Sequence, residues 1–162
     1  MMRLPFTIKA DQRGAALIEL ALAAPFFAAL VIGMVDMSRA YSMKLKLEQS
    51  AQRAIEKVQA SATKPTDFTY VGTEATTAAT AAGYSGSTAT VDYWLECNGT
   101  KTAETTGAPL SPSNCSDGQT YARYVSVTVT NTYTPLFASR AWPGANAQGN
   151  IPISGYAGMR VQ

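Results

Sequence analysis

Few side chains in this 162-residue sequence can carry out chemistry. It contains no histidine and only two cysteines, which excludes histidine-based acid–base or nucleophilic catalysis and zinc sites built from histidine and cysteine. Catalysis by carboxylates alone would need two of them at a spacing that marks them as a catalytic pair. Neither Asp92 with Glu96 nor Glu104 with Asp117 has such a spacing. We therefore predict that the protein is not an enzyme and that it needs no cofactor and no metal ion.

The charge balance also narrows the class of protein. Thirteen Lys and Arg face eleven Asp and Glu, a net charge of +2. This near-neutral balance argues against nucleic acid as a partner, because phosphate binding needs a basic surface. The charge is unevenly distributed: residues 1–64 carry nine basic and five acidic residues, whereas residues 65–162 carry four and six. The two parts therefore have different compositions.

The clearest element is a transmembrane helix over Ala15–Val35. These 21 residues hold one ionisable side chain, Glu19, and at about 1.5 Å per residue a helix of that length crosses the roughly 30 Å hydrocarbon core of a bilayer. Arg3, Lys9 and Arg13 precede the apolar stretch. This basic flank predicts a single pass with the N-terminus in the cytoplasm and export of everything after residue 35.

Two residues interrupt the apolar stretch. A carboxylate at the bilayer centre costs on the order of 2.5–3.5 kcal/mol, and less near an edge, so Glu19 is either tolerated at the edge or awaits a cationic partner in the membrane or in an assembly. Pro25 lacks an N–H group and predicts a bent or loosened turn. A cleavable secretory signal ending near Ala23 is the alternative for the whole segment, but the apolar run continues for twelve residues beyond that position.

A helical pattern continues beyond the membrane to about Ala62. Apolar residues at three- and four-residue steps form one stripe, made of Leu47, Ala51, Ala54, Ile55, Val58 and Ala62. Pro65 then stops the helix, because the residue before a proline avoids helical angles. We expect the stripe to cover the apolar face of a small sheet.

The remaining residues predict an α+β head with a small antiparallel sheet. Apolar and polar residues alternate from Thr88, over Tyr121–Tyr133 and more briefly over 154–161, which is typical of strands with one buried face. Before them, Thr73 is expected either to cap a short helix that Gly83 stops or to lie in a flexible linker.

Cys97 and Cys115 lie at the two ends of a turn-rich segment. In an exported domain they predict one disulfide, worth roughly 3 kcal/mol in the chain-entropy model. Two free, buried thiols are the alternative.

The junction RGAALIE, residues 13–19, resembles the processing site of type IV pilin-like precursors. In that family a short basic leader ends in glycine, a prepilin peptidase cuts after it, and glutamate is the fifth residue of the mature protein. Cleavage after Gly14 would make Ala15 the first residue and Glu19 the fifth. Many major pilins have phenylalanine where this chain has Ala15.

The longer pattern RGAALIELALAAPFF, followed by a long helix, is similar to the TadE/TadG-like pseudopilins of tight-adherence (Tad/Flp, type IVc) pili. In those proteins Arg-Gly, a small-residue start, a glutamate and a proline near Pro25 recur together. The resemblance covers residues 13–62 well and 121–162 loosely. It implies a pilin-like fold and a minor pilin or pseudopilin that takes part in assembling an adhesive pilus.

The resemblance also implies partners for Glu19. The ammonium created at Ala15, on the same or a neighbouring subunit, would meet this carboxylate in a fibre and offset the cost of burying both charges. The implied partners are membrane lipid, the prepilin peptidase, other pilin subunits and the inner-membrane Tad assembly platform, with a homo-oligomer possible in a filament.

Together these patterns predict four segments: a leader at 1–14, a transmembrane helix at 15–35, its exported extension at 36–64 and a disulfide-bonded head at 65–162. They place the protein in the bacterial inner membrane with a periplasmic head, and in an extracellular pilus after assembly. The competing hypothesis is a permanently membrane-anchored periplasmic binding or adhesion module that never enters a pilus.

Overall fold

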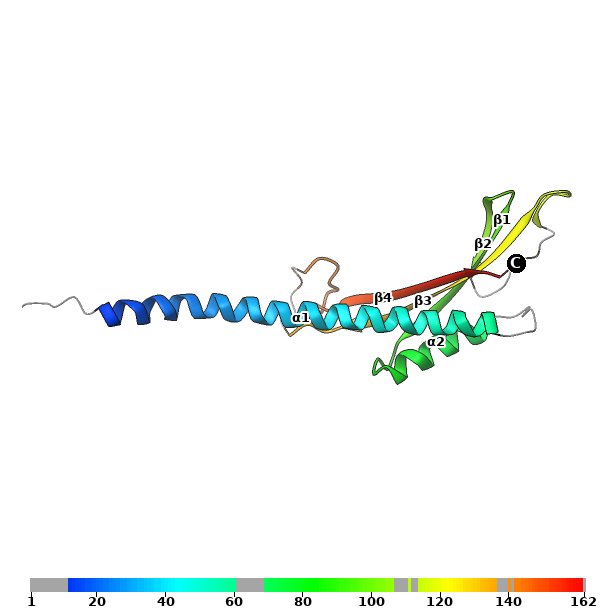
Figure 1. Cartoon of the computed structure of the whole chain (residues 1–162). Coiled ribbons are helices and arrows are strands. Elements are labelled where there is room, and N and C mark those ends of the chain that lie inside the picture. Colours follow the sequence, from blue (N-terminus) through cyan, green and yellow to red (C-terminus); the bar gives the residue numbers. More distant parts are fainter. Residues whose placement is uncertain are drawn as a thin grey trace, which may run out of the picture. The chain divides into compact units, whose positions relative to one another are not determined.

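A computed structural model describes residues 12–60, 69–106, 111, 114–136, 140 and 142–161. Figure 1 shows the elements in chain order: helices α1 (Gln12–Ala60) and α2 (Thr69–Ala81), then strands β1 (Thr88–Cys97), β2 (Thr100–Thr106), β3 (Tyr121–Tyr133) and β4 (Ile151–Arg160). The chain divides into two compact units that meet between Met37 and Ser38. The predicted α+β fold, a long N-terminal apolar helix and a small antiparallel sheet, is confirmed.

The four strands form one antiparallel sheet in the order β2-β1-β3-β4. Tyr93 lies opposite Val125, which lies opposite Met159, so these three residues share one face of the sheet. Trp94 and its cross-strand partner Tyr124 lie on the other face. The alternation predicted for the strands starting at 88 and 121 is thereby confirmed.

Strand β2 was not predicted, because a turn-rich segment was expected between the two cysteines. Asn98 and Gly99 both have positive φ, 51° and 76°, which is the conformation that a two-residue type I′ hairpin requires. The hairpin folds Thr100–Thr106 back along β1, with a register shift between Leu95 and Glu96. This strand is largely exposed and has almost no apolar face, so no hydrophobic alternation marked it.

The core lies between the helices and the inner face of the sheet. The buried residues of the cluster are Met43, Leu47, Ala51, Ala54, Ile55, Val58, Val71, Ala75, Ala79, Tyr93, Val125, Val127, Val129 and Tyr133. The predicted stripe on α1 is confirmed from Leu47 to Val58, and its last member, Ala62, lies outside the described residues. Burial of this stripe removes apolar surface from water on both the helix and the sheet.

Gly155 brings β4 into backbone contact with α1. A Cβ atom at this position would overlap the carbonyl group of Leu47 and the amide nitrogen of Glu48. A glycine inside a strand weakens it in isolation and marks a place where another backbone approaches closely. The absence of a side chain at Gly155 therefore sets how near the helix lies to the sheet.

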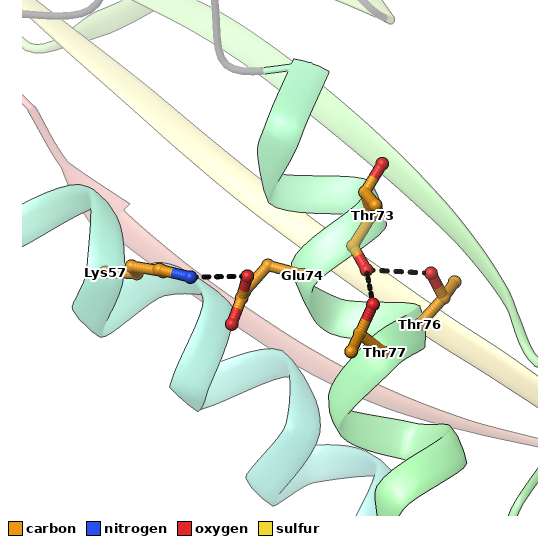
Figure 2. A network of polar contacts seen from close by, with 5 residues as sticks. All are labelled: Lys57, Thr73, Glu74, Thr76 and Thr77. Atoms are coloured by element: carbon orange, nitrogen blue, oxygen red, sulfur yellow. Dashed lines mark hydrogen bonds and ion pairs between the residues drawn. The ribbon is translucent and has the colours of Figure 1, made fainter.

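Helix α2 begins earlier than the sequence predicted. Thr73 is not its N-cap but lies in its second turn, where its carbonyl oxygen accepts hydrogen bonds from the hydroxyls of Thr76 (3.0 Å) and Thr77 (2.8 Å) (Figure 2). Threonine hydroxyls can bond to the preceding helical turn as well as cap a helix, which is why the residue type misplaced the start. The adjacent ion pair, Lys57 Nζ to Glu74 Oε2 at 2.6 Å, joins α1 to α2.

The predicted end of α2 is confirmed. The helix ends at Ala81 and Gly83 follows with φ at 95°. The N–H groups of Gly83 and Tyr84 donate to the carbonyls of Thr80 and Ala79, at 3.0 and 2.9 Å, closing the last turn.

The predicted disulfide is present between Cys97 and Cys115, with Cα atoms 5.7 Å apart. It joins the end of β1 to the loop that precedes β3. The covalent loop therefore contains the turn of the β1–β2 hairpin and strand β2, while β1 lies outside it.

Candidate functional site

The N-terminal part of α1 exposes a large apolar surface. Ten of its large apolar side chains have exposed fractions from 44% for Val35 to 74% for Leu22. They belong to Leu17, Ile18, Leu20, Leu22, Phe26, Phe27, Leu30, Val31, Met34 and Val35. The helix is long and apolar enough to cross a membrane, and its most apolar stretch is not buried by the rest of the described chain. A contiguous exposed patch of this kind marks a surface that another apolar phase covers.

The residues predicted for processing all lie in the first turns of α1. Gly14, Ala15 and Glu19 are exposed, and a Cβ at Gly14 would meet no atom within 4 Å. Ala15 and Glu19 are four residues apart, so they lie one above the other on the same helix face. The structure thus brings the predicted new N-terminus next to the predicted carboxylate.

Pro25 lies inside α1, and the chain is helical on both sides of it. The proline therefore does not end the helix, although its missing N–H still removes one hydrogen bond from the preceding turn. Next to it, the rings of Phe26 and Phe27 meet edge to face with centroids 6.1 Å apart.

An exposed apolar stripe continues along α1 past the predicted membrane boundary. Met37, Tyr41 and Leu45 are 67%, 62% and 39% exposed, and their four-residue spacing places them on one face. On the opposite face Met43 and Leu47 belong to the core. Between residues 37 and 45 the helix thus has two apolar faces, one packed and one exposed. The four-residue spacing of Met37, Tyr41 and Leu45 is visible in the sequence. The prediction, however, considered only the stripe that begins at Leu47 and packs in the core.

The outer face of the sheet carries a row of stacked groups. The rings of Trp94 and Tyr124 stack with centroids 4.9 Å apart at 3°, and Lys101 Nζ lies 5.4 Å from the Trp94 ring centre. Trp94 Nε1 donates to Glu96 Oε1 at 3.3 Å. The hydrogen bond of Tyr124 with Glu96 raises the pKa of the phenol, with burial adding to it and Arg160 opposing it.

This row fits a stabilising role better than a binding role. The two rings each cover one face of the other, and the lysine lies over the indole, as in other cross-strand aromatic pairs. Alternation in the sequence placed Trp94 and Glu96 on one face, but the register that brings Tyr124 beside them was not predictable. Among the residues that the structure describes, no three His, Cys, Asp or Glu side chains gather as metal ligands would.

A long apolar helix followed by a small disulfide-bonded sheet defines a pilin-like α+β protein. More particularly, residues 14–55 match the model of the TadE-like protein family. The match begins at the glycine of the predicted cleavage site and ends within the part of α1 that packs on the head, which confirms the predicted TadE-like resemblance for this segment. Searches of curated proteins and of solved structures found no match.

Proposed function

We propose that this chain is a minor pilin or pseudopilin associated with a Tad-type pilus. The observation that carries the proposal is a coincidence on one element. The exposed apolar surface of α1 lies inside residues 14–55, the segment that matches the TadE-like family model. Such a surface is stable in lipid before assembly and against other apolar helices afterwards. The role is structural, and the protein acts by being inserted and packed.

The proposed topology puts residues 1–14 in the cytoplasm, residues 15–35 across the inner membrane and the head in the periplasm. The basic flank Arg3, Lys9 and Arg13 supports this orientation by the positive-inside rule. The Cys97–Cys115 disulfide supports it independently, since disulfides persist in the periplasm and are rare in the cytosol.

We further propose cleavage after Gly14 by a prepilin peptidase. Gly14 has no side chain to obstruct a narrow protease subsite, and Ala15 beyond it is small and exposed. Cleavage removes the basic leader and creates an ammonium group one helical turn from Glu19. In a fibre this ammonium, or that of a neighbouring subunit, would pair with the carboxylate and lower the cost of burying it.

The exposed stripe of Met37, Tyr41 and Leu45 supports packing between subunits. Lipid covers the helix only as far as the bilayer extends, whereas the stripe continues for about 15 Å beyond Val35 at 1.5 Å per residue. Helices of other pilin subunits, delivered through the Tad assembly platform, would cover both the span and this stripe.

Mass spectrometry of the membrane and pilus fractions tests the processing step. In cells with active prepilin peptidase the mature chain should begin at Ala15, and Gly14→Leu should leave the leader attached. A wild-type chain that keeps residues 1–14, in cells where another prepilin is processed, would contradict the proposal. A permanently anchored module, in contrast, would behave identically with and without Gly14→Leu.

Replacement of the membrane carboxylate tests the assembly step. Glu19→Ala should insert into the membrane and lose its leader normally, yet fail to enter pili, because the ammonium of Ala15 then has no partner. Glu56→Ala, on the exposed surface of the same helix within the head, is the matched control and should assemble normally. Unchanged pilus incorporation of Glu19→Ala would count against the role of the carboxylate.

A further inference from the structure

One end of the head contains a polar cavity with an arginine in its wall. Arg39 lines this cavity of about 400 Å³ together with Ser42, Tyr84 and Thr132, each of which carries a hydroxyl group. The Arg39 side chain is exposed and forms no ion pair with any residue in the described ranges. A guanidinium can bind both oxygens of a carboxylate at once, and hydroxyls can donate to the lone pairs that remain. We call this cavity the socket.

Asn131 holds the wall of the socket in place. Its side-chain amide donates to the carbonyl of Ser85 at 3.1 Å and to the hydroxyl of Ser87 at 2.8 Å. These bonds tie the end of β3 to the segment that follows α2, and Asn131 and Ser85 both line the socket. The wall is therefore made of two segments joined to each other rather than of independent surface side chains.

The disulfide-bonded end of the head carries a carboxylate on a braced turn. Asp117 lies in the turn 116–119, which a backbone hydrogen bond of 3.1 Å closes between its two ends. Cys115 before the turn is held by the disulfide. Thr120 after it donates to the side-chain oxygen of Asn98 from its N–H and from its hydroxyl, each at 3.1 Å. Asp117 itself is exposed. We call this turn the knob.

Arg39 and Asp117 stand out among the charged residues of the head. Within its described part, four charged side chains have no hydrogen bond, ion pair or ring contact, namely Arg39, Arg53, Glu56 and Asp117. Arg53 and Glu56 lie three residues apart on α1 and line one cavity, so their opposite charges offset each other locally. Arg39 and Asp117 are left as one cation and one carboxylate, each without a counter-charge nearby.

The socket and the knob lie at opposite ends of the sheet. Residues 131–134, at the end of β3, line the socket, whereas the knob leads into Tyr121 at the start of the same strand. The twelve steps from Tyr121 to Tyr133 span about 40 Å, so the two charges cannot meet within one head. Two parallel copies displaced along the strand would bring them together. Such a head-to-tail contact does not close on itself and builds an open filament.

We propose that the knob of one copy of this chain docks in the socket of the next. The Asp117 carboxylate accepts hydrogen bonds from the Arg39 guanidinium and from the socket hydroxyls. The occupant is a second copy because the head itself supplies both members of the complementary pair. The inference rests on the proposed function, since parallel copies stack in this way in a filament, and it names a contact between heads in that assembly.

Photocrosslinking from the knob tests the contact. The full chain carries benzoylphenylalanine in place of Ser116, which is exposed, and is irradiated in cells that form pili. The expected product is a pair of full chains in which mass spectrometry maps the crosslink from the knob to the lining of the socket. Absence of this pair, or a product joined to a different protein or to another part of the chain, would overturn the proposal.

Exchange of the two charges tests the pairing of Arg39 with Asp117. Arg39→Glu and Asp117→Arg should each remove most of the crosslinked pair, because two like charges then meet. The double variant Arg39→Glu/Asp117→Arg should restore it, which a damaged head could not do. Arg53→Glu lies on the same helix and lines the other cavity; this matched control should crosslink like its parent. A double variant as weak as the single variants, or single variants as strong as the parent, would overturn the pairing.

Failure of the proposed function would give a different result. Cleavage after Gly14 and recovery of the chain from sheared pili report that function independently of the crosslink. A processed chain that is present in pili without the crosslinked pair contradicts only the contact between heads. A chain that forms the pair in the membrane fraction but never enters pili contradicts only the role in the pilus.

Discussion

Helix α1 contains two halves that share a secondary structure and differ in everything else. Before Met37 most of its large apolar side chains are exposed. After Ser38 one face is packed in the core, with Leu47 at 0% exposed, and charged residues such as Lys57 occupy other positions. The first half is apolar all round, as a membrane helix is, and the second is amphipathic, as a helix on a sheet is.

The comparison teaches where each half finds its stability. The second half buries its stripe against residues of the same chain, so its partner is encoded in the same sequence. The most apolar stretch of the first half is not buried by the described head, so its surface has no partner encoded in the same way. Substitutions of the same type should therefore have different consequences in the two halves.

The largest difference is expected for leucine. Leu47→Ala should lower the free energy of unfolding of the head by about 2–5 kcal/mol, because it leaves a cavity at a fully buried position. Leu22→Ala, at a position that is 74% exposed, should leave the head unchanged. Thermal unfolding of the full chain in detergent micelles, followed by near-ultraviolet circular dichroism, measures both. Equal effects of the two substitutions would refute the division of the helix.

Removing the disulfide should destabilise the head by roughly 3 kcal/mol, in proportion to the entropy that the closed loop removes from the unfolded chain. The double variant Cys97→Ser/Cys115→Ser should melt earlier than the oxidised parent and no longer respond to dithiothreitol. The helical signal of the apolar half, measured by far-ultraviolet circular dichroism, should persist when the head has unfolded. A melting temperature independent of reductant in the parent would contradict this expectation.

Glycine provides a third comparison between the halves. Gly155→Ala should cost about 1–3 kcal/mol, because the new methyl group meets the backbone of α1 and the helix must move away. At Gly33 no atom lies within 4 Å of an added Cβ. Gly33→Ala should therefore leave the stability of the head unchanged. If both variants melt at the same temperature, the close approach at Gly155 does not determine the packing.

The smallest effect concerns the outer face of the head at high pH. The Tyr124 phenol has a pKa raised above its ordinary value near 10, mainly by its hydrogen bond with Glu96. A raised pKa in the folded state contributes stability that is complete below the unfolded pKa and is lost as the pH rises through the folded one. Absorbance titration of tyrosinate, with Tyr124→Phe to identify the signal, should show a late component that Glu96→Gln moves to lower pH. An unmoved component would exclude the carboxylate as its cause.

Sequence patterns predicted the elements whose signals are local and periodic. Tyr121–Tyr133 alternates strictly and became β3, and the stripe from Leu47 to Val58 became the buried face of α1. Gly83 marked the end of α2 because its positive φ suits a helix C-terminus. The hairpin at Asn98-Gly99 had a recognisable turn signal, but the polar strand after it had no apolar face to support the assignment.

The candidate sites divide in the same way. Gly14, Ala15 and Glu19 were found from a motif within one short segment, and their proximity follows from helical spacing alone. The stacked row on the outer face of the sheet was not predicted, because Trp94 and Tyr124 lie thirty residues apart in the sequence. Only the register of β1 on β3 brings these two rings together.

By itself the sequence determined an apolar helix of membrane length with one carboxylate, an amphipathic continuation and strands with one buried face. These properties depend on residue type and spacing within a few turns. The tertiary structure decided the strand order β2-β1-β3-β4, the stacking of Trp94 on Tyr124 and the backbone contact at Gly155. Each of these depends on the register between distant segments, which is set by how whole faces pack rather than by any local preference.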